Sequence, residues 1–487
     1  MCYNCKFPQI PFGMNKNKVF FDIHLHAFNL SHAGLLAFAN RFLLSSNLSL
    51  SDFYQKKWLK ISWIITKSIL ISAGKAAISI FQKRRKGKTG LRRIVNMLSI
   101  FENDIARQFQ YLELDYLMLN PELKKIINRV KIPVNYREFS KELKTTWEKI
   151  GKKLIINQNE FSKVILTPLM MDFNYKGFDG LDKNSVHYYL PPRKQIQDQA
   201  IDLFAGIRQY YGHSRVQLFE IFPFKAINTQ NLEYKEKEPI HRRSLKEVLN
   251  RSFQDFSGSD TGKKRYEKVK KKLKEFRECE NPFNSDNYYF AGIKVYPPLG
   301  FDPWPESKCS EWEKVNFLYQ YCVDKNIPVT THCSDGGFIV VEKQKSLNRT
   351  SPEKWKEVLK AYPSLKLNFA HHGIRNNKIN NDWTERILNM VVEYENVYFD
   401  IADNGYGDYY ERLIRFILEK HPCREELKQI SSRMLFGSDF MMNLRHADSY
   451  NEYLSTFSAT NAFEKCEHLD KLSICTGNPF EFVFGKI

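Results

Sequence analysis

The chain has 487 residues with nine cysteines, whose scattered positions exclude a disulfide framework and agree with a reducing compartment. Met1 to Lys18 contains no apolar signal core, and no uncharged run reaches the length of a membrane span, so we expect a cytoplasmic protein without a transmembrane segment. The formal net charge of +19 favours a small anionic substrate.

The first apolar run, from Val19 to His26, predicts a β-strand. Alternate residues of a strand point to the same side, so His24 and His26 would leave the end of this strand together. Two such imidazoles are half of a metal site, and imidazole suits zinc, iron, copper or nickel. The same spacing also occurs in surface or buried histidines without metal, so the interpretation depends on the rest of the chain.

Residues 33–160 contain helix-like stretches and few strand signals, so they predict a helical insertion domain. The stretch from Trp58 to Phe81 is the most apolar, but lysines on one helical face interrupt it, which indicates an amphipathic helix. A run of seven basic residues without an acid lies between Lys83 and Arg93. The predicted helices span Leu35 to Ser45, Asp52 to Phe81, Gly90 to Tyr116 and Tyr136 to Lys152.

Seven further apolar runs follow, and each ends near a residue that can bind or activate. Helix-like segments separate most of them, and strands that alternate with helices predict a parallel sheet. Eight such units suggest an α/β fold of the (β/α)8 TIM-barrel type, with its chemistry at the carboxyl ends of the strands. The residues near these ends are Asp172, Glu220, Lys294, His332, His371, Asp400 and Asp439, and the clearest helices are Ser310 to Asp324, Pro352 to Ala361 and Trp383 to Glu393.

In this order the strand-end residues resemble the amidohydrolase superfamily, in the branch that contains metal-dependent hydrolases and decarboxylases. The resemblance covers residues 1–32 and 161–487, and it implies that these segments form a TIM-barrel catalytic domain. An insertion at 33–160 would then emerge at the active-site face, where we expect a helical cap. The matching positions are Asp22-x-His24-x-His26, Lys294, His332, His371, Asp439 and the closing segment Gly477-Asn478-Pro479-Phe480.

The resemblance also implies a divalent metal, with zinc as the first expectation, in a site of one or two ions. His24, His26 and Asp439 would hold one ion and leave positions open for water, whose acidity the ion raises. Asp439 would accept a proton from the attacking water and pass it to the leaving group.

Three residues have more open roles under the same resemblance. His332 would be a further metal ligand, and His371 would either bind a second ion or polarise the substrate. Lys294 would bridge two ions as a carbamate, or in a one-metal site remain a cation that holds an anionic substrate. Because the superfamily histidine stands two residues before a glycine, His371 is preferred over His372.

Other polar residues near strand ends have weaker assignments. Asp22 is expected to orient a ligand rather than bind the metal. A carboxylate at Asp172, Glu220 or Asp400 is equally typical of a cap on the following helix. Residues that follow strand ends are candidates for lining a substrate pocket, with ordinary packing as the alternative. These candidates are Tyr296, Trp304, Asn404 and Arg445.

The leading functional hypothesis is a metal-dependent hydrolase of the amidohydrolase type, which attacks an amide, ester, lactone or related bond with activated water. The alternative within the same branch is a nonoxidative decarboxylase. A second class is a binding or regulatory protein whose basic cap engages nucleic acid, although no helix-turn-helix, finger or RNP-like motif accompanies the charge. A homo-oligomer is the default expectation for quaternary structure.

Overall fold

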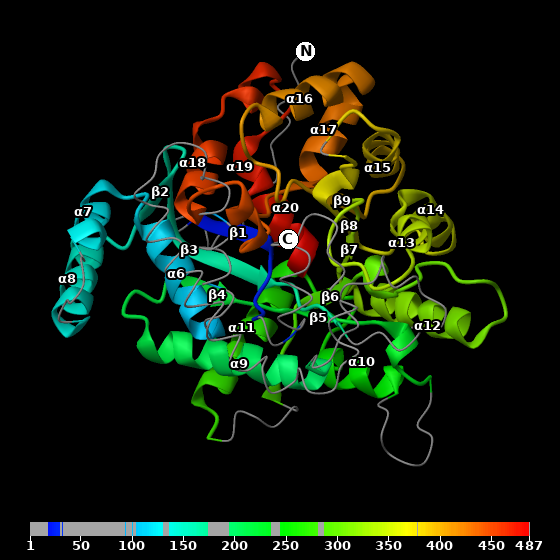
Figure 1. Ribbon diagram of the computed structural model, residues 1–487, viewed down its shortest axis with the longest axis horizontal. Coiled ribbons are helices and arrows are strands. Elements are labelled where there is room, and N and C mark those ends of the chain that lie inside the picture. The colour runs from blue at the N-terminus through cyan, green and yellow to red at the C-terminus, as the bar shows by residue number, and fades with distance from the viewer. Residues whose placement is uncertain are drawn as a thin grey trace, which may run out of the picture.

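The computed structural model describes residues 18–29, 32, 93, 100, 104–129, 136–173, 194–234, 244–280, 287–376 and 378–486. The helices predicted over 35–45 and 52–81 lie outside these ranges, as does the basic run after Lys83 apart from Arg93. The protein has a mixed α/β fold in which helices surround the strands (Figure 1). Within the described ranges, no helix has the length and apolar character needed for a membrane span.

The first sheet is built around β1 (Lys18–Leu25) and β3 (Asn159–Pro168), which pair in parallel. On its other side β3 pairs in parallel with β4 (Phe219–Ile221), while β2 (Leu154–Ile156) pairs with it in antiparallel fashion. Both faces of β1 are buried, which is typical of a strand in a parallel sheet covered on both sides.

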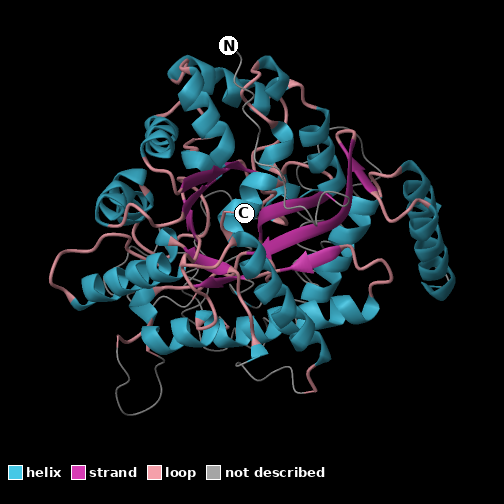
Figure 2. Ribbon diagram, turned by 180° about the vertical axis from the view of Figure 1, so that it is seen from behind, coloured by secondary structure: helices cyan, strands magenta, loops and turns pink. Residues whose placement is uncertain are grey.

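The second sheet contains six parallel strands in chain order, so their carboxyl ends meet at one edge. The strands lie in the interior and helices lie around them (Figure 2). Isolated parallel bridges, Leu25 with Phe440 and Leu169 with Phe224, connect it to the first sheet. In the described ranges the ladders remain two sheets, and a closed barrel is not formed. The six strands are β5 (Phe224–Ala226), β6 (Gly292–Val295), β7 (Val329–His332), β8 (Leu367–Ala370), β9 (Val397–Asp400) and β10 (Met434–Leu435).

Helices occupy most of the connections between these strands, and the predicted helices that begin near Ser310, Pro352 and Trp383 are confirmed. From the first sheet onward they are α9 (Ile196–His213), α10 (Leu245–Phe253), α11 (Gly262–Glu278), α12 (Ser310–Lys325), α13 (Lys343–Thr350), α14 (Pro352–Ala361), α15 (Asp382–Glu393), α16 (Tyr409–Lys420), α17 (Arg424–Arg433), α18 (Tyr450–Ala459), α19 (Lys471–Ile474) and α20 (Gly477–Phe484).

The described part of 33–160 contains α6 (Ile105–Leu117), α7 (Pro121–Arg129) and α8 (Tyr136–Lys149). The last of these confirms the helix predicted from Tyr136. The ring of Tyr116 on α6 contacts that of Phe20 on β1, with 6.0 Å between the centroids, and its hydroxyl lies 2.6 Å from that of Tyr450 on α18. Helix α6 therefore packs in the layer around the first sheet, whereas α7 and α8 lie at the periphery (Figure 1).

Lys366 immediately precedes β8 and is buried, with its ammonium 3.2 Å from the carbonyl of Glu481 on α20. Burial, with a further effect from Arg265, lowers the pKa of Lys366 from its ordinary 10.5 to about 7. Between these two pH values the unfolded chain binds more protons than the folded chain, so the stability of the protein rises with pH across that window.

Replacing Lys366 by Met is therefore expected to raise the free energy of unfolding by roughly 1–2 kcal/mol near neutral pH, because a buried cation is exchanged for an apolar chain of similar shape. The variant should also lose most of the increase in stability above about pH 7. Urea unfolding at several pH values measures both effects. Lys360→Met, on the exposed face of α14, is the control and should keep the wild-type pH dependence. A Lys366→Met profile parallel to wild type would contradict the expectation.

Candidate metal centre

The predicted metal ligands come from different strands and lie at their carboxyl ends. Parallel strands present these ends at one edge, which explains how residues far apart in sequence meet. His24 is near the end of β1 and His26 directly follows it, Lys294 is on β6, His332 ends β7, His371 follows β8 and Asp439 lies shortly after β10.

Three of these residues form a buried cluster. The ligand atoms of His24, His371 and Asp439 lie within 4.8 Å of one another. Nε2 of His24 is 3.5 Å from Oδ1 of Asp439, and Nε2 of His26 is 3.1 Å from the same oxygen. Two imidazoles and one carboxylate form a donor set typical of catalytic zinc.

The polar atoms of this cluster are incompletely satisfied by the described chain. Nε2 of His24, Nζ of Lys294 and Oδ1 of Asp439 are buried and have no hydrogen-bond partner there. Buried polar atoms are almost always hydrogen-bonded, so three such atoms at one centre require another explanation. A divalent cation would satisfy the nitrogen and the oxygen, and we conclude that these residues fit a metal ion.

Hydrogen bonds behind the cluster orient the histidine rings. In each case Nδ1 donates to an acceptor of the protein, which leaves the lone pair of Nε2 available for a metal. Outer acceptors of this kind accompany most metal-binding histidines. The pairs are His24 with Oδ2 of Asp400 at 3.0 Å, His26 with the carbonyl of Leu169 at 3.0 Å, and His371 with the carbonyl of Ala402 at 3.2 Å.

The protonation state of the histidines also suits metal binding. Burial lowers the pKa of His24 and His371 well below that of an ordinary imidazole, and the nearby Lys294 ammonium acts in the same direction. Both rings are therefore neutral near physiological pH, and the neutral ring is the form that binds a cation.

Asp400 links several parts of the centre. Its Oδ1 accepts from the backbone amides of His371 at 3.0 Å and Ala402 at 3.2 Å. Its Oδ2 accepts from Nδ2 of Asn368 at 2.8 Å and from the ring of His24. Because this carboxylate contacts both histidines of the cluster, it positions the ligands instead of capping the following helix.

Asp22 acts on the opposite side of the cluster. Its carboxylate accepts from the backbone amide of Ser438 at 3.0 Å and from the hydroxyl of Tyr450 at 3.0 Å, while burial raises its pKa to about 7. A Cβ on Gly437 would come within 2.5 Å of Cβ of His24, so only glycine allows the two backbones this approach. Asp22 thus holds the segment that precedes Asp439, in keeping with the orienting role predicted for it.

The backbone at the centre is strained. His371, His372, Asp403 and Asp439 have φ values of 63°, 40°, 63° and 56°. Left-handed conformations cost L-residues roughly 1–2 kcal/mol each. Non-glycine residues in this region cluster at functional sites, where the surrounding structure enforces them. The local geometry therefore supports a functional role for these loops.

Lys294 and His332 lie beside the cluster. Burial lowers the pKa of Lys294 to about 8, although Asp400 and Asp439 offset part of the effect, so more of this amine is neutral near pH 7 than in an exposed lysine. Nε2 of His332 lies 3.2 Å from the carbonyl of Gly336 and 3.1 Å from Oγ of Ser334. His332 is not among the three residues whose ligand atoms lie within 4.8 Å of one another, but its ring centroid lies 5.0 Å from that of His371.

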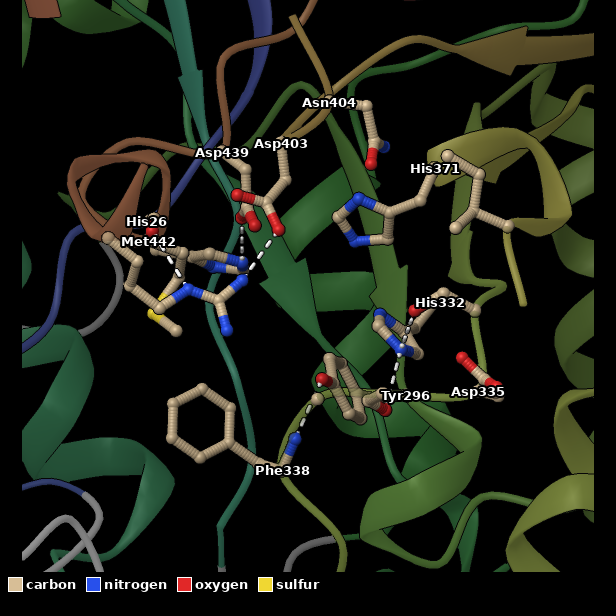
Figure 3. Close-up of a pocket in the computed structure, with 15 residues that line it drawn as sticks. His26, Tyr296, His332, Asp335, Phe338, His371, Asp403, Asn404, Asp439 and Met442 are labelled. Atoms are coloured by element: carbon tan, nitrogen blue, oxygen red, sulfur yellow. Dashed lines mark hydrogen bonds and ion pairs between the residues drawn. The ribbon is translucent and has the colours of Figure 1, made fainter. Parts of the chain in front are cut away.

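A cavity of about 240 Å³ adjoins the cluster (Figure 3). Three of the four predicted pocket residues line it, namely Tyr296, Asn404 and Arg445, whereas Trp304 is not part of its lining. Nη2 of Arg445 donates to Oδ2 of Asp403 at 2.7 Å, which fixes the guanidinium at the wall. Several other residues of the wall were not predicted, although they follow strand ends and could have been sought there. They are Ser334, Asp335, Phe338, Asp403 and Met442.

Three residues near strand ends lie away from the cluster. Oδ2 of Asp172 accepts from Asn231 at 2.8 Å. Glu220 accepts from the hydroxyl of Tyr266 at 2.6 Å in a different cavity. The ring of His372 lies against the hydroxyl of Tyr409, so the structure places His371 and not His372 in the cluster.

Comparisons with known proteins give one family match and several similar solved structures. Residues 271–483 match the amidohydrolase family, a segment that contains Lys294, His332, His371 and Asp439 but begins after His24 and His26. No curated protein matches the chain. Similar solved structures include an uncharacterized TIM-barrel protein from Bordetella bronchiseptica (15% identity, 57% of this chain and 71% of that chain, TM-score 0.31). They also include a probable 2-pyrone-4,6-dicarboxylic acid hydrolase from Acinetobacter baumannii with citric acid bound (13% identity, 71% of this chain and 88% of that chain, TM-score 0.32). A third is a dihydroorotase from Campylobacter jejuni (11% identity, 63% of this chain and 75% of that chain, TM-score 0.24).

Proposed function

We propose that this chain, whose residues 271–483 match the amidohydrolase family, is a metal-dependent hydrolase on a mixed α/β fold whose two sheets are joined by isolated bridges. The family identifies the chain as an enzyme. The observation that carries the finer proposal is the buried cluster of His24, His371 and Asp439, with its unsatisfied nitrogen and oxygen. The substrate would be a small anion with an amide, ester, lactone or related bond.

The three cluster residues would hold one divalent cation, for which zinc is the first expectation. His26 is close enough to Asp439 to join them, while His332 and Lys294 are the remaining proposed ligands. When bound, the cation would polarise the bond to be cleaved and raise the acidity of water. A second ion would require Lys294 as a carbamate, a modification that its partly neutral amine favours.

Asp439 is suited to move the proton in this reaction. Burial raises the pKa of Asp439 to about 6, with an opposing effect from His26, so the carboxylate is mostly ionised at neutral pH yet remains a usable base. Its Oδ1 is directed at His24 and His26, where the cation would be held, so the second carboxylate oxygen, Oδ2, would accept the proton from water. The same oxygen would then return the proton to the leaving group.

Arg445 is the cationic side chain of the cavity lining to which we assign an anionic group of a small substrate. The cavity volume of about 240 Å³ lies below the range of about 300–1,000 Å³ that is usual for small-ligand sites, so only a compact substrate would fit. Arg445 lines it, and the contacts of its guanidinium with Asp403 and the carbonyl of Met442 hold it in place at little further entropic cost on binding. An anionic group of the substrate would bind at this guanidinium.

Nonoxidative decarboxylation is the second candidate. Lys294 is a buried cation close to the centre, and in a one-metal site it could hold a carboxylate that leaves as carbon dioxide. Comparing carbon dioxide release with proton release over carboxylated aromatics and lactones separates the two reactions. A cap formed by 33–160, nucleic-acid binding by its basic run, a cytoplasmic location and a homo-oligomer are further proposals that rest on the sequence alone.

Metal analysis of the purified protein tests the central proposal. Wild type should bind one or two divalent ions per chain, and His24→Ala should weaken this binding by roughly 10–100-fold or more because it removes a ligand. His213→Ala, at the exposed end of α9, is the control and should bind as wild type does. Wild type that retains no more metal than His24→Ala would remove the metal-dependent mechanism.

A further inference from the structure

A second, larger cavity lies at the opposite ends of the strands from the metal centre. Its volume is about 710 Å³. Val19 and Lys163, from the amino-terminal halves of β1 and β3, line it together with residues just before β4, whereas the metal ligands lie at the carboxyl ends of the strands. Tyr266 of α11 and Phe480 of α20 complete the wall. This cavity is therefore separate from the proposed active site.

The side chains around this cavity are mostly basic. Five basic residues line it, against only two acidic ones, Glu220 and Glu267. Glu220 is already engaged, because it accepts from the hydroxyl of Tyr266 at 2.6 Å and lies 3.4 Å from the ammonium of Lys270. The cavity consequently carries an excess of positive charge. The five basic residues are Lys152, Lys163, Arg215, Lys263 and Lys270.

Most of this charge is not neutralised by the protein. Lys152, Arg215 and Lys263 are exposed and form no ion pair with any described residue. Lys163 is half-buried; its ammonium donates to the carbonyl of Gln217 at 2.5 Å and is attracted by Glu220 and Glu113, although it forms no ion pair in the described chain. Burial also lowers the pKa of Lys163. An anion in the cavity would compensate these charges.

Helix α11 presents one basic face to the cavity. Lys263, Glu267 and Lys270 are three and four residues apart, so they lie on the same side of the helix. Lys271 belongs to the same helix but points elsewhere, since it does not line the cavity and lies 3.6 Å from Glu275. Some lysines of α11 therefore face the cavity, whereas others form ion pairs on the outer surface of the helix.

We propose that this cavity binds a small organic molecule that carries two or more phosphate groups. Its volume lies within the range of sites for small ligands, which is about 300–1,000 Å³, and is far larger than a single phosphate requires. Cations from three different segments, near Lys152, Arg215 and Lys263, could contact separate phosphates. Val19 and Trp147 supply apolar wall for the organic part.

Isothermal titration of the full chain with ATP and with inorganic tripolyphosphate tests the proposal. Saturable binding of at least one of them is expected at low salt, weakening as salt is added. The double variant Arg215→Ala/Lys263→Ala should weaken it by roughly tenfold or more, which a loss of about 1.4 kcal/mol would produce. Lys271→Ala is the matched control on the same helix and should bind as wild type does. Both substituted positions are exposed, so circular dichroism should show an unchanged fold.

Three outcomes would overturn the proposal. The first is no saturable binding of either probe to wild type. The second is an equal loss in Lys271→Ala and in the double variant, which would indicate general attraction to a basic protein. The third is loss of binding in Arg445→Ala, because the anion would then occupy the cavity beside the metal centre. This last result would leave the proposed hydrolase function intact, so the two proposals fail separately.

Discussion

The Asp439→Asn variant is expected to lose about 10³-fold or more in kcat on any ester, lactone or amide that the wild-type enzyme cleaves. The substitution keeps the shape of the side chain but removes both a charged metal ligand and the proposed proton acceptor. Folding should not suffer, because Asn occupies the same buried volume as Asp. Steady-state kinetics, metal content and the midpoint of urea unfolding measure the three effects.

The control for this experiment is Asp408→Asn, an exposed carboxylate at the start of α16 that pairs with Arg412. It should leave kcat within about threefold of wild type, as surface substitutions usually do. If Asp439→Asn also retained kcat within that range while binding metal normally, Asp439 would be neither a required ligand nor the proton carrier, and the proposed mechanism would fail.

Asp400→Ala should lower the free energy of unfolding by about 3–5 kcal/mol, the usual cost of removing one member of a buried charged network. Four donors lose their acceptor in this variant: the ring of His24, the amide of Asn368 and the backbone amides of His371 and Ala402. Buried donors without a partner are expensive. Chemical denaturation of metal-free protein measures this loss, since bound metal would add its own stabilisation.

The same substitution should weaken metal binding by roughly 10–100-fold, because His24 and His371 would no longer be held in their orientations. Asp400→Asn is the companion variant. Its remaining carbonyl oxygen can accept from the two backbone amides, so its loss of stability should be smaller, while the His24 ring loses its charged acceptor. A loss of less than about 1 kcal/mol in Asp400→Ala would show that the network is not a source of stability.

The strands and the residues at their ends were predictable because local sequence encodes them. β1 is a largely apolar segment, and the histidine pair at its carboxyl end indicates at which end of the strand the site lies. The order of Lys294, His371 and Asp439 along the chain then predicted that they meet at one edge, since the carboxyl ends of parallel strands converge. The structure brings these residues together near His24, while their roles remain predictions.

Other features depend on contacts that no local pattern specifies. Asp400 could equally have capped a helix, and its partners on β1 and β8 appear only in three dimensions. Nε2 of His332 lies 3.2 Å from the carbonyl of Gly336, in the loop that follows its own strand, and no local pattern specifies this contact. Trp304 follows a strand end just as Arg445 does, yet it is absent from the wall of the cavity because its loop packs elsewhere.

The hydroxyls of Tyr116 and Tyr450 and the carboxylate of Asp22 form a continuous chain of hydrogen bonds. It joins helix α6, which the sequence assigns to the insertion, to the backbone amide of Ser438 beside the proposed base. The two regions are therefore thermodynamically coupled: deleting α6 would expose the first sheet and also release the segment that orients Asp439. We therefore expect that helix α6, unlike the peripheral α7, cannot be removed without disturbing the segment beside Asp439.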